Sequence, residues 1–133
     1  MKKVFLLTVF SIMSICAFSQ LIVRTYKNQA GTYDDYFKKW RFDEMKYSDI
    51  SIVVERGYFQ FDDQAQSLYR VVQKQGETLE SNYKSTTWTC KDEKNLDCTV
   101  QIIHYFENKS NVFVVIYDKI CYVYHIKEVE QNK

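Results

Sequence analysis

Proline is absent from this chain of 133 residues, and glycine occurs only three times, at Gly31, Gly57 and Gly76. Turns must therefore rely largely on Asn, Asp, Ser and Lys, because the two strongest turn formers are scarce. No segment of roughly 20–50 residues repeats, and no linker or low-complexity tract divides the chain. These absences argue against a repeat architecture and favour a single domain.

Net charge is also nearly absent. The chain carries 18 Lys and Arg against 17 Asp and Glu, and removal of Lys2 and Lys3 with the leader described below would leave sixteen against seventeen. A nearly neutral chain with both signs interspersed exerts no long-range attraction on phosphate backbones or anionic lipids. We therefore expect no nucleic-acid partner.

The first 19 residues have the form of a bacterial signal peptide. Two lysines precede an apolar core at residues 4–10, and Ala17 and Ser19 put small residues at the −3 and −1 positions of a cleavage site before Gln20. The apolar stretch is shorter than the roughly 20 residues that cross a bilayer, so we expect no stable transmembrane anchor. Cys16 would permit a lipid-anchored precursor, but the bulky residue before it disfavours that processing.

Strand-forming residues dominate what remains. Aromatic residues make up 17% of the chain, with eleven Tyr and nine Phe. Alternating or short apolar runs predict strands at residues 21–27, 50–55, 58–62, 68–74, 98–106, 112–117 and 121–126, with turns at 28–31, 56–57, 62–64 and 75–77. Residues 78–89 form either one polar strand or a pair of short pieces. We expect residues 1–19 to be removed and residues 20–133 to form one all-β domain, a small antiparallel meander that closes as a barrel or a sandwich.

Residues 33–47 fit two patterns. Tyr33, Phe37 and Trp40 have the spacing of one helical face, whereas residues 36–42 also alternate as a strand does. The many aromatic side chains favour a strand. A short helix stays open as the alternative.

The segment at residues 112–117 is apolar at every position before its final tyrosine. Both faces of this strand should therefore be covered, and a barrel covers only one of them. The second cover is either the 33–47 segment or another copy of the chain. A homodimer is thus one expected assembly.

Three cysteines follow the leader: Cys90, Cys98 and Cys121. Cys90 and Cys98 flank a turn-rich loop that brings their strands side by side, so in an exported chain we expect a disulfide between them. Closing so small a loop would stabilise the fold by about 2–3 kcal/mol. Cys121 leads a buried-looking strand and is expected to be a core residue.

Nothing in the pattern of reactive side chains predicts catalysis or metal binding. Cys121 and His125 are four residues apart on one strand, about 13 Å, and His104 stands on a neighbouring strand with nothing to fix its distance. No zinc-site spacing occurs, and the acidic loop after Cys90 lacks the glycine and distal glutamate of an EF-hand. We expect no catalytic residue, no metal and no cofactor.

Tyrosine is the most suggestive feature of the sequence. Tyrosine combines a large apolar area with a hydroxyl group that can stay hydrated, so rows of tyrosine suit binding faces. The alternative is cross-strand aromatic pairing that only stabilises the sheet. The candidate ligand-binding residues are Trp88, Tyr105, Tyr117, Tyr122 and Tyr124.

The spacing Trp88-x-Cys90-x-Asp92, followed by Cys98-x-Val100 and a Tyr-rich final meander, resembles small uncharacterised secreted bacterial β-proteins. The resemblance covers roughly the chain after the leader, and it implies export and a compact β-fold without an attached activity. A lipocalin-like barrel is a broader analogy. The chain departs from that family because it has no Gly-x-Trp signature near its start.

Three functions are compatible with these features. The first is a secreted or periplasmic, non-enzymatic module that binds a small apolar ligand or a protein partner through its aromatic-rich sheet. The alternative is a structural, self-assembling envelope protein. A small thiol-dependent hydrolase is the least favoured, because the sequence offers no base beside a thiol.

Overall fold

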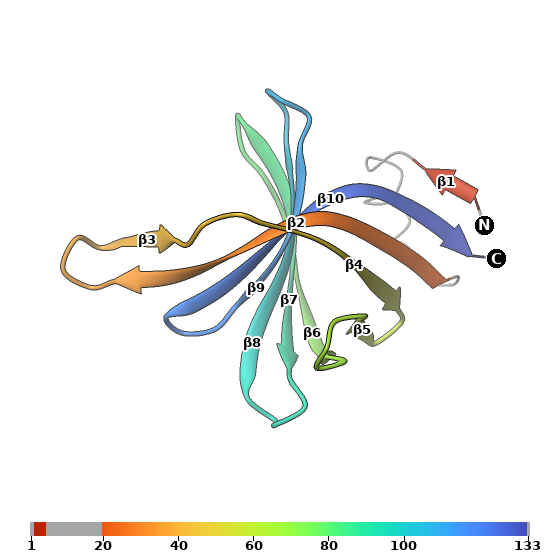
Figure 1. Cartoon of the computed structure of the whole chain (residues 1–133), viewed down its shortest axis with the longest axis horizontal. Coiled ribbons are helices and arrows are strands. Elements are labelled where there is room, and N and C mark those ends of the chain that lie inside the picture. The colour runs from red at the N-terminus through yellow and green to blue at the C-terminus, as the bar shows by residue number, and fades with distance from the viewer. Residues whose placement is uncertain (1, 5–19, 133) are drawn as a thin grey trace.

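The computed structural model describes residues 2–4 and 20–132, which form ten strands and no helix (Figure 1). The strands are β1 (Lys2–Val4), β2 (Gln20–Asp34), β3 (Lys39–Phe42), β4 (Lys46–Glu55), β5 (Tyr58–Phe61), β6 (Leu68–Leu79), β7 (Tyr83–Lys91), β8 (Asp97–Tyr105), β9 (Asn111–Ile116) and β10 (Ile120–Asn132). The predicted signal peptide lies outside the described residues except for β1, which pairs with the end of β10. No helix in the described part is long and apolar enough to span a membrane.

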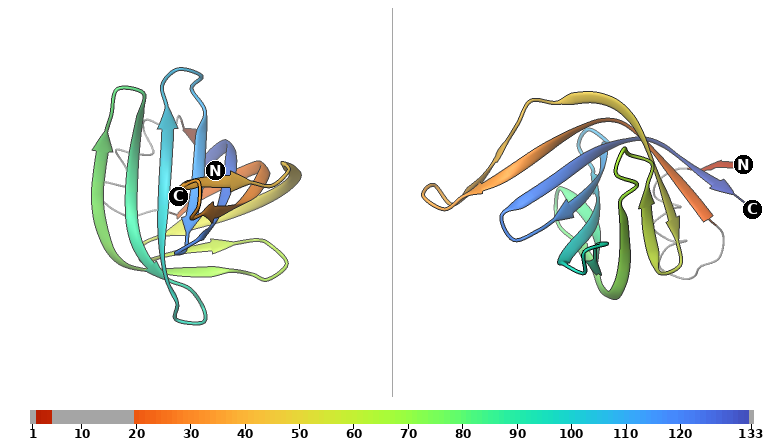
Figure 2. Two further views of the ribbon diagram at one scale, coloured as in Figure 1. Left: turned by 90° about the vertical axis from the view of Figure 1, so that its left-hand side faces the viewer. Right: turned by 60° about the horizontal axis from the view of Figure 1, so that its bottom comes forward.

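Eight of these strands close into an antiparallel barrel (Figure 2). Strands β4 to β10 pair in sequence order, β2 pairs with β4, and β10 pairs with β2 from Ile120↔Thr32 to Asn132↔Gln20. This confirms the predicted all-β antiparallel meander. The pairing of β10 with β2 selects a barrel over a sandwich, because a barrel leaves no open edge between its first and last strands.

Aromatic side chains fill the barrel interior. Phe59, Phe61 and Phe113 are almost completely buried. Their rings meet edge to face, with centroids 5.4 Å apart for Phe59–Phe113 and 5.6 Å apart for Phe61–Phe113. Such pairs stabilise a core beyond the effect of the buried area alone. The strand alternation therefore produces a packed core with one face of each strand inside.

Residues 33–47 contain strands, as the aromatic side chains predict, and the alternative of a short helix is wrong. β2 extends beyond the barrel and pairs with β3, from Gly31↔Phe42 to Asp34↔Lys39. A tight turn replaces the helix because the Asp34 carboxylate accepts the N–H groups of Tyr36 and Phe37. We call residues 29–42 the arm; it projects from the barrel on the left of Figure 1.

The arm covers the outer face of β9 and β10. It is therefore the segment that covers the second apolar face of residues 112–117. Trp40 packs against a buried cluster of Val112, Val114 and Cys121. The turn after β9 is tied to the arm, since Tyr33 N–H donates to the Lys119 carbonyl at 2.9 Å. The chain thus covers this face itself, and the reason to expect a second copy there is removed.

Two glycines lie within strands at positions where the sequence predicts turns. The predicted turn at 28–31 is wrong: β2 continues through Gly31, where a Cβ atom would lie 2.8 Å from both Cys121 Sγ and the Phe42 ring. The predicted turn at 75–77 is also wrong. β6 continues to Leu79, and Gly76, with φ of 136°, forms a β-bulge where the register to β7 shifts.

Candidate functional site

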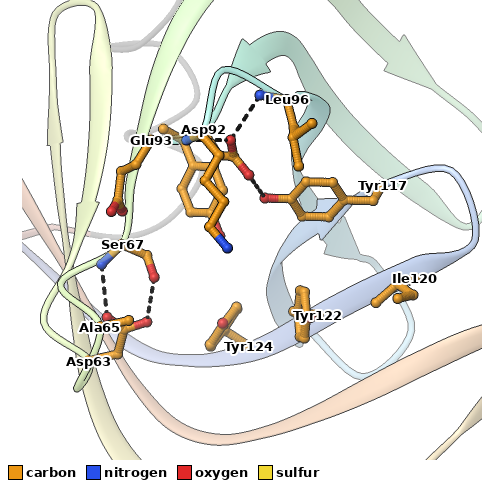
Figure 3. Close-up of a pocket in the computed structure, with 12 residues that line it drawn as sticks. Asp63, Ala65, Ser67, Asp92, Glu93, Leu96, Tyr117, Ile120, Tyr122 and Tyr124 are labelled. Carbon is orange, nitrogen blue, oxygen red and sulfur yellow. Dashed lines mark hydrogen bonds between the residues drawn. The ribbon is translucent and has the colours of Figure 1, made fainter.

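A pocket of about 490 Å³ opens at one end of the barrel, where the 62–67 loop, the 92–96 loop and the turn before β10 meet (Figure 3). Its lining comes from both loops, from β6 and from the start of β10. The lining residues are Asp63, Ala65, Ser67, Tyr69, Asp92, Glu93, Lys94, Leu96, Tyr117, Ile120, Tyr122 and Tyr124. We call this cavity the mouth pocket.

Four tyrosines form the walls and the base of the mouth pocket. The rings of Tyr117 and Tyr122 stand nearly perpendicular, at 86°, with centroids 6.4 Å apart. Tyr69 and Tyr124 lie deeper, and each packs edge to face on Phe61, at 5.4 and 4.9 Å. The core phenylalanine therefore sets the position of the two deeper rings, which are held on strands rather than on loops.

Hydrogen bonds fix the two loops that frame the opening. Asp92 Oδ1 accepts the backbone N–H groups of Lys94 and Leu96, both at 2.9 Å, and Asp92 Oδ2 accepts the Tyr117 hydroxyl at 2.8 Å. In Figure 3 the Tyr117 phenol points at this carboxylate. Glu93 Oε1 accepts the N–H of Leu68 at 2.6 Å and so links the 92–96 loop to the start of β6.

Negative charge predominates around the opening. Three carboxylates, those of Asp63, Asp92 and Glu93, line the pocket with one ammonium group, that of Lys94. Burial acts to raise the pKa of the Asp92 carboxyl. The hydrogen bonds that it accepts, led by Leu96 N–H and the Tyr117 hydroxyl, outweigh burial and lower that pKa below its usual value. Asp92 is therefore ionised at neutral pH.

Three phenols of the mouth pocket stay protonated across the physiological range. Burial raises the pKa of Tyr69 to about 12, and the charges of Asp63 and Asp92 act in the same direction. Burial likewise raises the pKa of Tyr117 and of Tyr124. These hydroxyl groups can therefore donate hydrogen bonds and do not act as phenolate bases.

Comparison of the chain with protein-family models, with curated proteins and with solved structures finds no match. The resemblance to small secreted bacterial β-proteins therefore stays a prediction. Function has to be inferred from the chemistry of the pocket itself.

Three of the five candidate ligand-binding residues meet in the mouth pocket: Tyr117, Tyr122 and Tyr124. The other two lie elsewhere. Trp88 is buried in the barrel core, where its ring packs edge to face on Phe59 at 5.2 Å. Tyr105 stands on the outer surface and lines a groove beside the arm.

Sequence reasoning missed most of the remaining pocket residues. The sequence places Asp63 in a turn, Asp92 and Glu93 in an acidic loop without a metal-site pattern, and Tyr69 in a strand. Their turn character is real, since Asp63 accepts the N–H and the hydroxyl of Ser67, each at 2.9 Å. The sequence feature that could have indicated these residues is the acidic turn before each of β6 and β8. The two turns meet at the same end of the barrel only because the barrel closes.

Cys90 and Cys98 are cross-strand partners, as predicted, but the structure holds them as free thiols and so lacks the predicted disulfide. Both side chains are buried in the barrel core. Burial raises the pKa of Cys90 to about 12 and that of Cys98 to about 11. Because the thiolate is the reactive form, the raised pKa values disfavour reaction at these thiols.

Cys121, the third cysteine of the described residues, has no activating base among them. Burial raises the pKa of Cys121, whose side chain packs beneath the arm. The Nδ1 atom of His104 is hydrogen-bonded to Asn111, and burial lowers the pKa of His125. Among the described residues no group of three His, Cys, Asp or Glu side chains is placed to hold a metal ion. A thiol-dependent hydrolase gains no support from this geometry.

Changing Tyr117 to phenylalanine is expected to lower the free energy of unfolding by about 1–2 kcal/mol, because the variant loses a hydrogen bond to a carboxylate. It also returns the pKa of Asp92 toward its ordinary value. A lowered carboxyl pKa contributes stability that is complete above the unfolded pKa of about 4 and is lost as pH falls through the folded pKa. The variant should therefore lose less stability than the wild type on acidification.

Urea unfolding at a series of pH values checks this expectation. Tyr122→Phe is the matched control, because it removes a hydroxyl group from the same pocket and leaves the bond from Tyr117 to Asp92 in place. Equal stability losses in the two variants would contradict the proposed role of the Tyr117–Asp92 bond.

Proposed function

We propose that this protein is a non-enzymatic binding module, exported to the periplasm or secreted, that takes a small ligand into the mouth pocket. The observation that carries the proposal is the convergence of Tyr117, Tyr122 and Tyr124 with Tyr69 on one cavity. A volume of about 490 Å³ falls within the usual range for small-molecule sites. Phenol rings combine apolar contact with hydrogen bonding and lose little conformational entropy on binding.

The rigidity of the site supports the same proposal. Tyr69 and Tyr124 rest on the buried Phe61 ring, and Tyr117 is held by Asp92. A cavity whose walls are fixed before binding costs less free energy to occupy. The export assignment rests on the form of residues 1–19.

Removal of a rim ring tests the proposal. Tyr122→Ala is expected to weaken ligand binding about tenfold, since an aromatic ring that packs against a ligand contributes in this range. Tyr105→Ala is the matched control, because Tyr105 has the same exposed fraction of 37% but lies outside the mouth pocket. Native mass spectrometry of protein purified from its own host would measure the co-purified ligand.

Two results would count against the pocket. Loss of the adduct in Tyr105→Ala with retention in Tyr122→Ala would place binding on the outer surface. A wild-type protein that carries no adduct, and that no compound library shifts in thermal unfolding, would contradict a small-ligand function.

A further inference from the structure

The charge of the mouth pocket restricts the class of ligand. Three carboxylates and one ammonium group face the cavity, so its lining carries a net charge of about −2 at neutral pH. An anionic ligand would find one cationic side chain, Lys94, against three repelling groups. Fatty acids, phosphates and other anions are therefore disfavoured.

The carboxylates come from two loops of the opening. Asp63 stands on the loop before β6, and Asp92 and Glu93 stand on the loop before β8. The charge of Asp63 raises the pKa of both Tyr69 and Tyr124, so its potential reaches the deep wall of the cavity. A cation inside the pocket would be attracted from both loops.

One carboxylate oxygen in particular is available to a ligand. Glu93 Oε1 accepts the N–H of Leu68, and within the described residues Oε2 makes no hydrogen bond. Asp63 and Asp92 use their oxygens to hold their own loops, so they contribute charge rather than a free acceptor.

The aromatic walls favour the same ligand. The perpendicular rings of Tyr117 and Tyr122 form a corner, and the face of an aromatic ring attracts an ammonium group electrostatically. The apolar lining residues Leu96 and Ile120 flank that corner and suit the hydrocarbon part of a ligand.

From this arrangement, and resting on the proposed function, we propose that the ligand of the mouth pocket is a small organic cation: an amine with an aromatic or aliphatic body. The ammonium group lies at the rim between Glu93 and the Tyr117–Tyr122 corner. The apolar body reaches inward to Tyr124.

Three probes with the same ring body separate charge from shape: 2-phenylethylamine, 2-phenylethanol and phenylacetate. Isothermal titration calorimetry at neutral pH is expected to give an amine affinity about tenfold above that of the alcohol, with the acid weaker than both. Added salt should weaken amine binding and leave alcohol binding unchanged, because salt screens only the charge.

A charge-neutralised variant tests whether Asp63 and Glu93 attract the amine. Asp63→Asn with Glu93→Gln keeps an oxygen acceptor at each loop and is expected to remove most of the amine's advantage over the alcohol. Glu44→Gln with Glu107→Gln removes the same charge from exposed positions away from the pocket and should change neither affinity.

The outcomes separate the two proposals. An alcohol that binds as tightly as the amine, in a manner sensitive to Tyr122→Ala, overturns the cation assignment and leaves the binding function standing. Tighter binding of phenylacetate overturns the assignment as well. Absence of binding by all three probes also overturns it, and the mass of the co-purified adduct then decides the binding function separately.

Discussion

Replacing Phe61 with alanine is expected to lower the free energy of unfolding by about 3–5 kcal/mol, the usual cost of deleting a buried aromatic ring. Phe61 is completely buried and packs edge to face on Tyr69, Phe113 and Tyr124. Its loss leaves a cavity beneath the mouth pocket and releases the two deeper rings from their support. Urea unfolding measures the loss of stability, and titration with the ligand measures the loss of the preformed site.

Phe106→Ala is the matched control, because it deletes the same ring from a partly exposed loop. Its expected cost is under about 1 kcal/mol. If Phe61→Ala were to cost no more than the control, the ring cluster would not be the core of the barrel. If a stable Phe61→Ala variant still bound the ligand with unchanged affinity, the mouth pocket would not depend on the core ring beneath it.

The strands of the barrel were largely predictable, because alternation is a local property. The hairpin formed by β7 and β8 and the meander from β8 to β10 follow from apolar runs separated by short polar connections. Gly57, with φ of 96°, forms the predicted turn between β4 and β5. Gly76 also has a positive φ but forms a bulge, and only the pairing of β6 with β7 separates the two cases.

The arm was less predictable than the barrel. The length of β2 depends on its pairing with β10 as far as Ile120, which lies almost ninety residues away in the sequence. Gly31 has an extended backbone, so its role is to allow close approach rather than to form a turn. The two-sided apolar pattern at residues 112–117 did predict that something covers the outer face, although it left the cover open between the arm and a second copy.

The site was predictable only in part. Tyr122 and Tyr124 are two residues apart on one strand and must share a face, so their grouping follows from the sequence. Asp63, Tyr69 and Glu93 join them only because the barrel closes, which is a long-range event. Trp88 shares its strand face with Cys90, and both side chains lie in the barrel core rather than in a binding face.

Trp40→Ala is expected to release the arm from the barrel without unfolding the barrel itself. Trp40 packs on Val112, Val114 and Cys121, and its ring meets Tyr33 edge to face at 5.4 Å. Loss of a partly buried tryptophan should weaken arm docking by about 2–3 kcal/mol. That corresponds to a roughly 30- to 150-fold larger population in which the Cys121 thiol is accessible.

Thiol alkylation followed by mass mapping reads this population directly. All three described cysteines are buried, but only Cys121 lies beneath the arm, so Cys90 and Cys98 report on the barrel core within the same molecule. Faster labelling of Cys121 alone means that the arm opens locally. Equal acceleration of all three thiols would mean that Trp40 stabilises the whole fold, which contradicts a separable arm.

Two further variants test the same contact: one should also release the arm, and the other is a control. Gly31→Ala places a methyl group within 2.8 Å of Cys121 Sγ and of the Phe42 ring, so it should also accelerate Cys121 labelling. Phe37→Ala is the control, because this ring is 58% exposed at the tip of the arm and should leave the labelling rate unchanged. If Phe37→Ala exposed Cys121 as strongly as Trp40→Ala, the arm would be held by its turn rather than by the contact of Trp40 with β9 and β10.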